Sequence, residues 1–271
     1  MGIVLGIDVG GSTTKIIGIR DNALIGTLQV RATDQITSLF GAIGNFLIKN
    51  NMNLGDVSSI SLTGVGASFV NGPIYGIETR KVNEFQAIGY GALHQSGFEE
   101  AIIASMGTGT AFVRASGESI MHLGGSGVGG GTILGLSSII LGKGDIEAIK
   151  MLASTGKLEN VDLKVGDIIV QESLSLPMDI TAANFGNIKS TASEADLALG
   201  IVNMVFETVG MLAVFLARND HIKDILLTGA LTMFPQAEQI QQAFNALTDL
   251  RFTIPPNAVF ATAIGAACFP K

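Results

Sequence analysis

The sequence predicts an α/β fold in which two similar lobes enclose a ligand-binding cleft. Two observations lead to this prediction. The pattern of strand, glycine turn and strand occurs near residue 10 and again near residue 107, and helical segments follow each occurrence. In addition, many of the 35 glycines cluster into short runs, which is typical of backbone that approaches a ligand closely.

The composition excludes several classes of protein. The chain has 271 residues, of which 47% are hydrophobic and 14% charged, so it can bury a large core. A net charge of −7 leaves no basic surface for nucleic acid. The single cysteine, Cys268, excludes an intrachain disulfide. These features predict a protein that does not bind nucleic acid and does not depend on disulfides.

The most apolar stretch, residues 198–217, has the length of a membrane span but not its composition. It contains Asn203, Glu207 and Thr208, whereas a spanning helix needs about 20 predominantly apolar residues. We therefore expect a buried or interface helix and no membrane partner. The N-terminal segment lacks the basic and apolar regions of a secretory signal, and we expect a cytoplasmic protein.

The N-terminal part alternates strands and helices. A strand ends at Asp8, and a helix begins at Thr33 or Asp34 and closes at Asn50 and Asn51. The other predicted elements here are strands at 14–19, 23–31 and 60–63 and a helix at 84–95. Three antiparallel strands after a glycine turn differ from a dinucleotide-binding fold, in which a helix follows the glycines.

The pattern restarts near residue 100 and then becomes mainly helical. The predicted strands are 101–106, 111–114 and 225–228, and the predicted helices are 132–141, 145–154, 193–219, 237–247 and 262–269. We place the lobe boundary near Gly97. The N-terminal lobe is then residues 1–97, and the C-terminal lobe is residues 98–271.

The first candidate site is the glycine turn after the first strand. Glycines between two strands let backbone N–H groups point at phosphate oxygens, and a carboxylate at the strand end can hold Mg²⁺. The candidate nucleotide-binding residues of this turn are Asp8, Gly10, Gly11, Ser12, Thr13, Thr14 and Lys15. The alternative is an ordinary hairpin with a surface aspartate.

Two further glycine segments can face the same phosphates. In residues 107–110 the candidates are Thr108 and Gly109, and the alternative is a tight turn. Residues 124–132 lead into an apolar helix whose N-terminus favours an anion. Its candidates are Gly130, Gly131 and Thr132, and the alternative is a flexible linker. A later strand stops at Gly229, which by itself is only a strand end.

Glu84 is the candidate general base. It opens a predicted helix in an apolar neighbourhood, where a partly desolvated carboxylate can accept a proton from a hydroxyl. The alternative is a solvated glutamate favoured by the helix dipole. The three histidines, His94, His122 and His221, have no spacing typical of metal ligands.

Over nearly its whole length the chain resembles the type II pantothenate kinases, which have two ribonuclease-H-like lobes of the actin-like ATPase superfold. The resemblance is carried by the segments GIDVGGSTTK, VNEF, MGTGTA, GGSGVGGGTILGL, VDLKVGDI and, most distinctively, DITAANFG at residues 179–186. It implies phosphorylation of the primary hydroxyl of pantothenate by ATP, the first step of coenzyme A biosynthesis. The product is 4′-phosphopantothenate.

The resemblance also implies roles for individual residues. Residues 8–15 would hold the ATP phosphates with Mg²⁺ at Asp8, and Thr108 and residues 130–134 would also contact nucleotide. Glu84 falls on the catalytic base of the family, and Thr181 on a substrate-binding position. The family forms homodimers, and we expect the helix at residues 193–219 to lie at the interface.

One position departs from the family pattern. Members carry an arginine just before the glycine run, where it contacts pantothenate, and here that position is His122. Histidine lacks the planar fork of donors that arginine offers. This leaves two alternatives open: a kinase of the same fold that acts on another small hydroxyl compound, and a nucleotide-binding regulator without kinase activity.

A third relative, the ATPase that activates radical dehydratases, holds a [4Fe–4S] cluster between two subunits. Such a cluster needs four thiolates, and a dimer of this chain provides two. This alternative is discarded.

Overall fold

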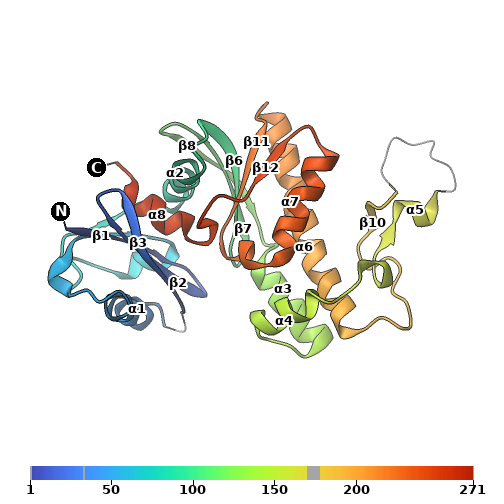
Figure 1. Ribbon diagram of the computed structural model, residues 1–271, viewed down its shortest axis with the longest axis horizontal. Coiled ribbons are helices and arrows are strands. Elements are labelled where there is room, and N and C mark those ends of the chain that lie inside the picture. The colour runs from blue at the N-terminus through green and yellow to red at the C-terminus, as the bar shows by residue number, and fades with distance from the viewer. Residues whose placement is uncertain (1, 33, 170–177, 271) are drawn as a thin grey trace.

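The protein contains two five-stranded sheets, one in each lobe, as the computed structural model shows for residues 2–32, 34–169 and 178–270 (Figure 1). The strands of the first sheet are β1 Ile3–Val9, β2 Thr13–Arg20, β3 Ala23–Arg31, β4 Val57–Thr63 and β5 Thr79–Lys81. Those of the second are β6 Glu100–Met106, β7 Thr110–Ser116, β8 Ser119–Ser126, β11 Asp224–Thr228 and β12 Arg251–Thr253.

The two sheets have the same topology. The first has the order β3-β2-β1-β4-β5, and the second has the matching order β8-β7-β6-β11-β12. In each sheet the first three strands are antiparallel and the last two run parallel to the strand before them. The prediction of two similar α/β lobes is confirmed.

Eight helices of the described residues cover these sheets and build the rest of the C-terminal lobe. They are α1 Gln35–Lys49, α2 Glu84–Ser96, α3 Gly130–Leu141, α4 Ile146–Ala153, α5 Val165–Ile168, α6 Glu194–Asn219, α7 Pro235–Leu247 and α8 Ala261–Cys268. A small two-stranded sheet joins β9 Leu163–Lys164 to β10 Thr181–Ala183.

The central strand β1 explains why the N-terminal lobe folds. Its odd-numbered side chains Ile3, Leu5 and Ile7 are 0% exposed and belong to one hydrophobic cluster with Ile43 and Phe46 of α1. Alternate residues of a strand face opposite sides of the sheet, so this face is the one that α1 covers. The other face of β1 is left for a second helix.

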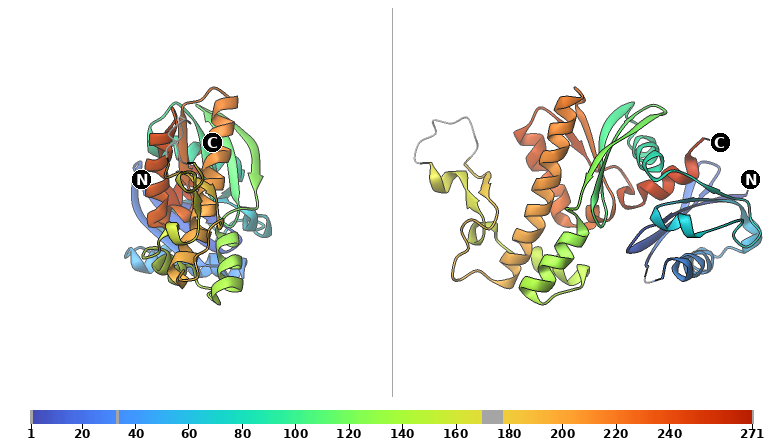
Figure 2. Two further views of the ribbon diagram at one scale, coloured as in Figure 1. Left: turned by 90° about the vertical axis from the view of Figure 1, so that its right-hand side faces the viewer. Right: turned by 180° about the vertical axis from the view of Figure 1, so that it is seen from behind.

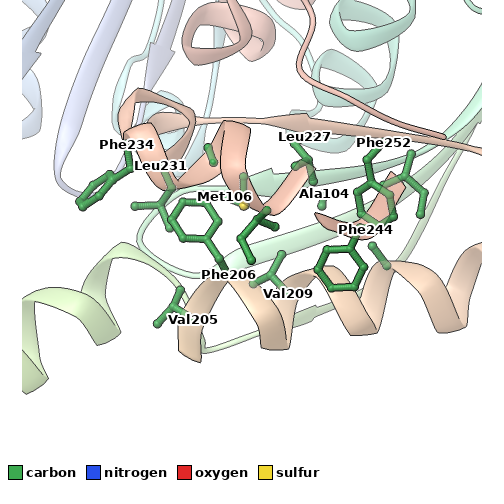
Figure 3. Packing of buried hydrophobic residues seen from close by; sticks show 14 of the residues in the cluster. Ala104, Met106, Val205, Phe206, Val209, Leu227, Leu231, Phe234, Phe244 and Phe252 are labelled. Atoms are coloured by element: carbon green, nitrogen blue, oxygen red, sulfur yellow. The ribbon is translucent and has the colours of Figure 1, made fainter. Parts of the chain in front are cut away.

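Helix α6 forms the centre of the C-terminal lobe. Val205, Phe206 and Val209 are at most 1% exposed and lie in one cluster with Met106 of β6, as Figure 3 shows. Among the described residues, α6 is the one helix that has the length and hydropathy of a membrane span, and 56% of its apolar window is buried. It packs as a core helix, as its sequence predicts.

The helices α2 and α8 each cover the sheet of the other half of the chain. Ile88 of α2 clusters with Ile103 of the second sheet, and Ile264 of α8 clusters with Ile17 of the first. In Figure 1, α2 accordingly lies against the second sheet and α8 against the first. The two helices therefore form the junction between the lobes.

Two glycines allow α2 and α8 to touch backbone to backbone. A Cβ on Gly91 would lie 2.0 Å from the carbonyl oxygen of Ala261, and one on Gly265 would lie 1.8 Å from that of Ala87. Only glycine fits at such a crossing, because any side chain would push the helices apart. The relative position of α2 and α8 is tightly determined.

The segment that contains β9 and β10 projects from the far side of α6 (Figure 2). Glu207 of α6 accepts hydrogen bonds from the Thr181 hydroxyl at 2.7 Å and from the Asn184 amide at 2.8 Å. Asn203 of α6 donates to the buried Asp162 carboxylate at 3.0 Å. These polar contacts fix the projecting segment to α6.

Candidate active site

Asp8 and Lys15 form a buried ion pair at the mouth of the N-terminal lobe. They are register partners on β1 and β2, each is 7% exposed, and Nζ lies 3.4 Å from Oδ2. A buried charge needs a partner, and here each residue supplies one for the other. The predicted metal ligand and the predicted phosphate-binding lysine therefore occupy one place.

The glycine turn between β1 and β2 is anchored at both ends. The Gly10 amide donates to the Thr13 carbonyl at 3.0 Å, and the Ala32 amide donates to the Ser12 carbonyl at 2.9 Å. A Cβ on Gly11 would meet open space, so this residue faces the cleft. The turn is fixed in place while Gly11 and Ser12 are presented outwards.

The structure separates Thr13 and Thr14. Thr13 is half-buried at the start of β2, whereas Thr14 is 0% exposed and its hydroxyl has no partner among the described residues. Neighbouring strand residues face opposite sides of the sheet. Of the predicted residues in this turn, Thr14 is thus inside the lobe, whereas Gly11 and Ser12 are exposed.

The second glycine turn lies opposite the first. The Ser12 and Thr108 hydroxyl oxygens are 3.2 Å apart, and the Arg31 guanidinium pairs with the Asp145 carboxylate in the other lobe. Both contacts join segments about a hundred residues apart in the chain. The two predicted phosphate loops therefore contact each other where the two lobes meet.

The start of α3 supports the second turn. The Gly130 amide donates to the Gly107 carbonyl at 2.9 Å, and the Gly131 amide donates to the Thr108 carbonyl at 2.8 Å. The Thr132 hydroxyl donates to the Gly127 carbonyl at 3.0 Å. The donors at the start of α3 therefore bond to the glycine segments, and the Gly130 and Gly131 amides fix the conformation of the turn at residues 107–109.

Gly229 ends β11 beside the same turn. Its φ of +93° is in the left-handed region, and a Cβ would lie 2.5 Å from the Met106 carbonyl oxygen. Glycine is required there for both reasons. Gly229 lets the 3-10 helix Ala230–Met233 leave the sheet next to β6.

A matching feature at the end of β4 was missed by the sequence reasoning. Thr63 and Gly64 repeat the Thr228 and Gly229 pair: both threonines are at most 1% exposed with unpartnered hydroxyls among the described residues, and both glycines have positive φ. A Cβ on Gly64 would lie 2.5 Å from Asp8 Oδ1. The shared letters Leu-Thr-Gly at 62–64 and 227–229 are the signal that could have revealed it.

Glu84 is the first residue of α2 and lies near the Asp8 and Lys15 pair. The helix is capped by the Asn83 side chain, which accepts from the Phe85 and Gln86 amides. Burial raises the pKa of the Glu84 carboxyl, the negative charge of Asp8 raises it further, and Lys15 opposes this. A partly desolvated carboxylate with a raised pKa is a stronger base than an exposed one.

His122, on β8, lies against the start of α2. Its ring stacks on that of Phe85, with centroids 3.8 Å apart and planes 12° from parallel. Arg114 is engaged elsewhere, because its guanidinium contacts the Asp220 carboxylate at 3.4 Å. The stack therefore joins β8 to the residue that follows Glu84 in the chain.

Thr181 is not brought to Glu84 within one chain. It lies on β10 in the projecting segment and donates to Glu207 of α6. Figures 1 and 2 show β10 on the side of α6 that faces away from both sheets. Thr181 is thus separated from the two glycine turns, which contact each other through Ser12 and Thr108.

Comparison with known proteins gives one family match and several full-length relatives. The family described as Fumble matches residues 27–245. The chain is similar to a type II pantothenate kinase of Staphylococcus epidermidis, with 30% identity over 97% of this chain and 98% of the relative. It is also similar to that of Staphylococcus haemolyticus, with 28% identity over 97% and 98%.

The similar solved structures share the fold. Component A of the (R)-2-hydroxyglutaryl-CoA dehydratase of Acidaminococcus fermentans matches with a TM-score of 0.69 and 18% identity over 98% of this chain and 96% of that one. A ROK family glucokinase of Streptomyces griseus in complex with glucose and AMPPNP matches with a TM-score of 0.62 and 12% identity, over 98% of both chains. At these identities the likeness concerns architecture alone.

Proposed function

The chain belongs to the Fumble family, and from this premise we propose that it phosphorylates the primary hydroxyl of pantothenate with ATP. The hydroxyl oxygen forms a bond to the γ-phosphorus, the bond from that phosphorus to the β,γ-bridging oxygen breaks, and ADP leaves. The products are 4′-phosphopantothenate and ADP. The reaction is the first step of coenzyme A biosynthesis, and we infer that it takes place in the cytoplasm.

The full-length match to type II pantothenate kinases carries this proposal, and Glu84 is close enough to Asp8 and Lys15 for their charges to affect its pKa. In our proposal Glu84 orients the attacking hydroxyl and takes its proton. Lys15 offsets negative charge on the transferred phosphoryl group, and most of the rate enhancement comes from positioning and electrostatics.

The two glycine turns are proposed to hold the triphosphate. Backbone amides of residues 11–12 and 108–109 would donate to its oxygens from opposite lobes, with Ser12 and Thr108 adding hydroxyls. The segments at residues 130–132 and Gly229 would shape the site from behind. The division into lobes at residues 1–97 and 98–271 remains part of this proposal.

The residues at Asp8 fit a magnesium ion. Mg²⁺ in nucleotide sites takes one or two carboxylates and otherwise binds phosphate oxygens and water. Asp8 provides one carboxylate at the strand end, and its register neighbour in β4 is Thr63, whose hydroxyl has no partner in the part of the chain that the structure describes. When bound, the ion would neutralise charge on the β- and γ-phosphates.

We also propose that the protein is a homodimer that uses α6. Met211 and Phe215, one turn apart on α6, are 39% and 59% exposed, although 13 of the 26 residues of this helix are buried in its lobe. Contiguous exposed apolar surface can mark an interface between proteins. Since Thr181 is remote from Glu84 in its own chain, it can serve as a substrate residue only from a second copy.

His122 favours testing a second kind of acceptor. A stacked histidine offers fewer hydrogen bonds than an arginine fork, so a kinase acting on another small hydroxyl compound remains the alternative to pantothenate. The dehydratase component shares the fold, but its relatives' iron–sulfur chemistry would need four thiolates and this chain has one cysteine.

The test is the release of ADP from ATP and Mg²⁺ in the presence of pantothenate, a panel of sugars and a panel of pantothenate-like amides. Release that depends on pantothenate supports the proposal. Release that depends on another hydroxyl compound would identify that compound as the phosphoryl acceptor. Binding of ATP without acceptor-dependent release would identify a nucleotide-binding regulator instead.

A further inference from the structure

Arg80, on the edge strand β5, binds the C-terminal end of α8. Its Nη2 donates to the carbonyl oxygens of Ala266 at 3.2 Å and Phe269 at 2.6 Å, and its Nη1 donates to that of Pro270 at 3.3 Å. Its Nε donates to the Ser61 hydroxyl in β4 at 2.9 Å. One side chain therefore ties the C-terminal end of α8 to the first sheet.

The end of a helix is a suitable place for such a group. The last carbonyls of a helix have no partner within the helix, and they carry the negative end of its dipole. A guanidinium supplies several donors in a rigid plane as well as a positive charge. Arg80 therefore satisfies α8 in a way that a shorter or uncharged side chain could not.

The position of α8 then determines that of α2. The helix lies against β1 at Gly6, where a Cβ would be 2.1 Å from the Ala263 carbonyl oxygen. On its other side it meets α2 at Gly265, where a Cβ would be 1.8 Å from the Ala87 carbonyl oxygen. With backbone contact on both sides, a shift of α8 must move α2 as well.

Helix α2 carries Glu84 at its first residue, only four positions after Arg80. Between them, the Val82 amide donates to the Leu62 carbonyl at 2.8 Å, and the Val82 side chain lies in one apolar cluster with Ala87 and Ala266. The connection from Arg80 to Glu84 thus runs along the chain and also through α8.

We propose that Arg80 is a positioning residue for Glu84: it holds α8 against β1 and α2 so that the carboxylate stays beside the Asp8 and Lys15 pair. The inference rests on the proposed function, because it assigns Glu84 the role of base. Arg80 itself touches neither acceptor nor nucleotide in this arrangement.

The first experiment replaces the guanidinium and measures ADP release. Arg80→Ala is expected to lower kcat by about 10- to 100-fold, because a displacement of roughly 1 Å at a reacting group has that effect, while KM for ATP and for acceptor changes little. A cavity of about 380 Å³ lined by Arg80, Lys81 and Gln86 adjoins the hydrogen bonds that Arg80 makes to the end of α8. Millimolar guanidinium should enter there and restore part of the lost kcat.

Arg114→Ala is the matched control. Arg114 also makes an ion pair that joins two elements of the fold, but its partner Asp220 lies at the end of α6. Its loss should leave kcat within about twofold of wild type and unaffected by guanidinium. Equal losses of kcat in both variants, or a folded Arg80→Ala protein with the wild-type kcat, would overturn the proposal.

A second measurement is independent of turnover. Hydrogen exchange of the Phe85, Gln86 and Ala87 amides, which bond to Asn83 in the first turn of α2, should be faster in Arg80→Ala than in wild type or Arg114→Ala. Unchanged exchange of these amides would contradict the positioning role of Arg80, whether or not the protein phosphorylates pantothenate. The absence of pantothenate-dependent ADP release in wild type would contradict only the proposed function. If Arg80→Ala does not fold, Arg80→Lys, which keeps the charge with fewer donors, should show both effects to a smaller degree.

Discussion

Ser12 and Thr108 lie 96 positions apart in the chain, and their hydroxyl oxygens are 3.2 Å apart across the cleft. Each belongs to a glycine turn that is fixed by its own backbone hydrogen bonds, Gly10 to Thr13 in one lobe and Gly107 to Gly109 in the other. The contact therefore brings together two rigid loops. A phosphate that displaces this contact would receive donors from both lobes.

Removal of either hydroxyl should weaken ATP binding. Ser12→Ala and Thr108→Val are each expected to raise KM for ATP by roughly 2- to 10-fold, the value of one net hydrogen bond, with kcat less affected. Steady-state ADP release over a range of ATP concentrations measures this. Ser116→Ala, which removes an exposed hydroxyl from the end of β7, serves as the control, and a KM change as large there would contradict the assignment.

Substitution of the proposed base should affect the chemical step. Glu84→Gln keeps the shape of the side chain and removes its basicity, so kcat should fall by roughly 10²- to 10⁴-fold. Nucleotide binding, followed by equilibrium titration with ADP, should remain. Glu78→Gln, at an exposed position just before β5, should retain wild-type kcat. A Glu84→Gln enzyme with normal turnover would exclude Glu84 as the base.

The same substitution should stabilise the fold at neutral pH. Burial, aided by Asp8, raises the pKa of Glu84 above its ordinary value, so ionisation of this group opposes folding. The stability that the uncharged Glu84 carboxyl contributes is fully present below its unfolded-state pKa, and it is lost as the pH rises through its folded-state pKa. Glu84→Gln should thus have a higher Tm than wild type at about pH 7.5, and the difference should vanish near pH 4. Thermal unfolding at both pH values tests this, and a lower Tm for the variant at neutral pH would contradict it.

Asp196 should have the opposite pH dependence. Its carboxylate accepts hydrogen bonds from the Ser193 amide at 2.8 Å, the Lys157 amide at 2.7 Å and the Asn160 side chain at 3.2 Å. The Ser193 amide is the largest of several hydrogen-bond donors that lower its pKa from 3.8 to about 2. The stability that ionised Asp196 contributes is present above its unfolded-state pKa, and it is lost as the pH falls through its folded-state pKa.

Asp196→Asn is therefore expected to lower the free energy of unfolding by about 2 kcal/mol at neutral pH. The difference in free energy of unfolding between the variant and wild type should narrow as the pH falls toward about 3. Urea unfolding at the two pH values measures this, with Asp21→Asn in the exposed turn before β3 as the control. A gap that stays constant with pH would show that the charge of Asp196 is not the cause.

A charge on the exposed face of α6 should separate the proposed dimer. Phe215→Glu places a carboxylate where apolar surface would be buried, so the protein should sediment as a monomer in analytical ultracentrifugation. Ile48→Glu makes the same kind of change on α1, where Ile48 is 79% exposed, and should leave the dimer intact. Monomeric wild type, or a dimeric Phe215→Glu protein, would contradict the proposed interface.

Elements with strong local signals could be predicted from the sequence. Ser193 and Asp196 form a capping box, in which each residue bonds the backbone of the other, and the predicted helix at 193–219 differs from α6 only by its cap residue. Helix α1 likewise begins after Asp34, whose carboxylate accepts from the Thr37 amide at 2.7 Å. In both cases the information lies within a few neighbouring residues.

Other elements depend on partners that are distant in the chain. Strand β8 extends through Gly124 and Gly125, which have a low preference for strands, and it forms because β7 supplies the hydrogen bonds. The sequence pattern does not predict the three-residue strands β5 and β12. Each of them adds an edge to an existing sheet and depends on the neighbouring strand for its hydrogen bonds.

Part of the candidate site was equally inaccessible to local reasoning. The helical character of residues 84–95 could be predicted, but not that Ile88 would face the second sheet, because either sheet offers an apolar surface. The position of Thr181 on the far side of α6 depends on its bond to Glu207, which no local pattern predicts. Arg80 gave no signal, since its acceptors are backbone carbonyls about 190 residues away.

The exchange of α2 and α8 between the lobes has a consequence for the use of ATP. Glu84 is on the helix that covers the second sheet, yet that helix touches α8 backbone to backbone, and α8 touches β1 of the first sheet in the same way. With both contacts in place, the base stays close to the first phosphate loop, because opening of the lobes would have to separate one of these pairs of backbones. Protection of ATP from hydrolysis by water would then depend on which molecule reaches Glu84, and not on withdrawal of the base.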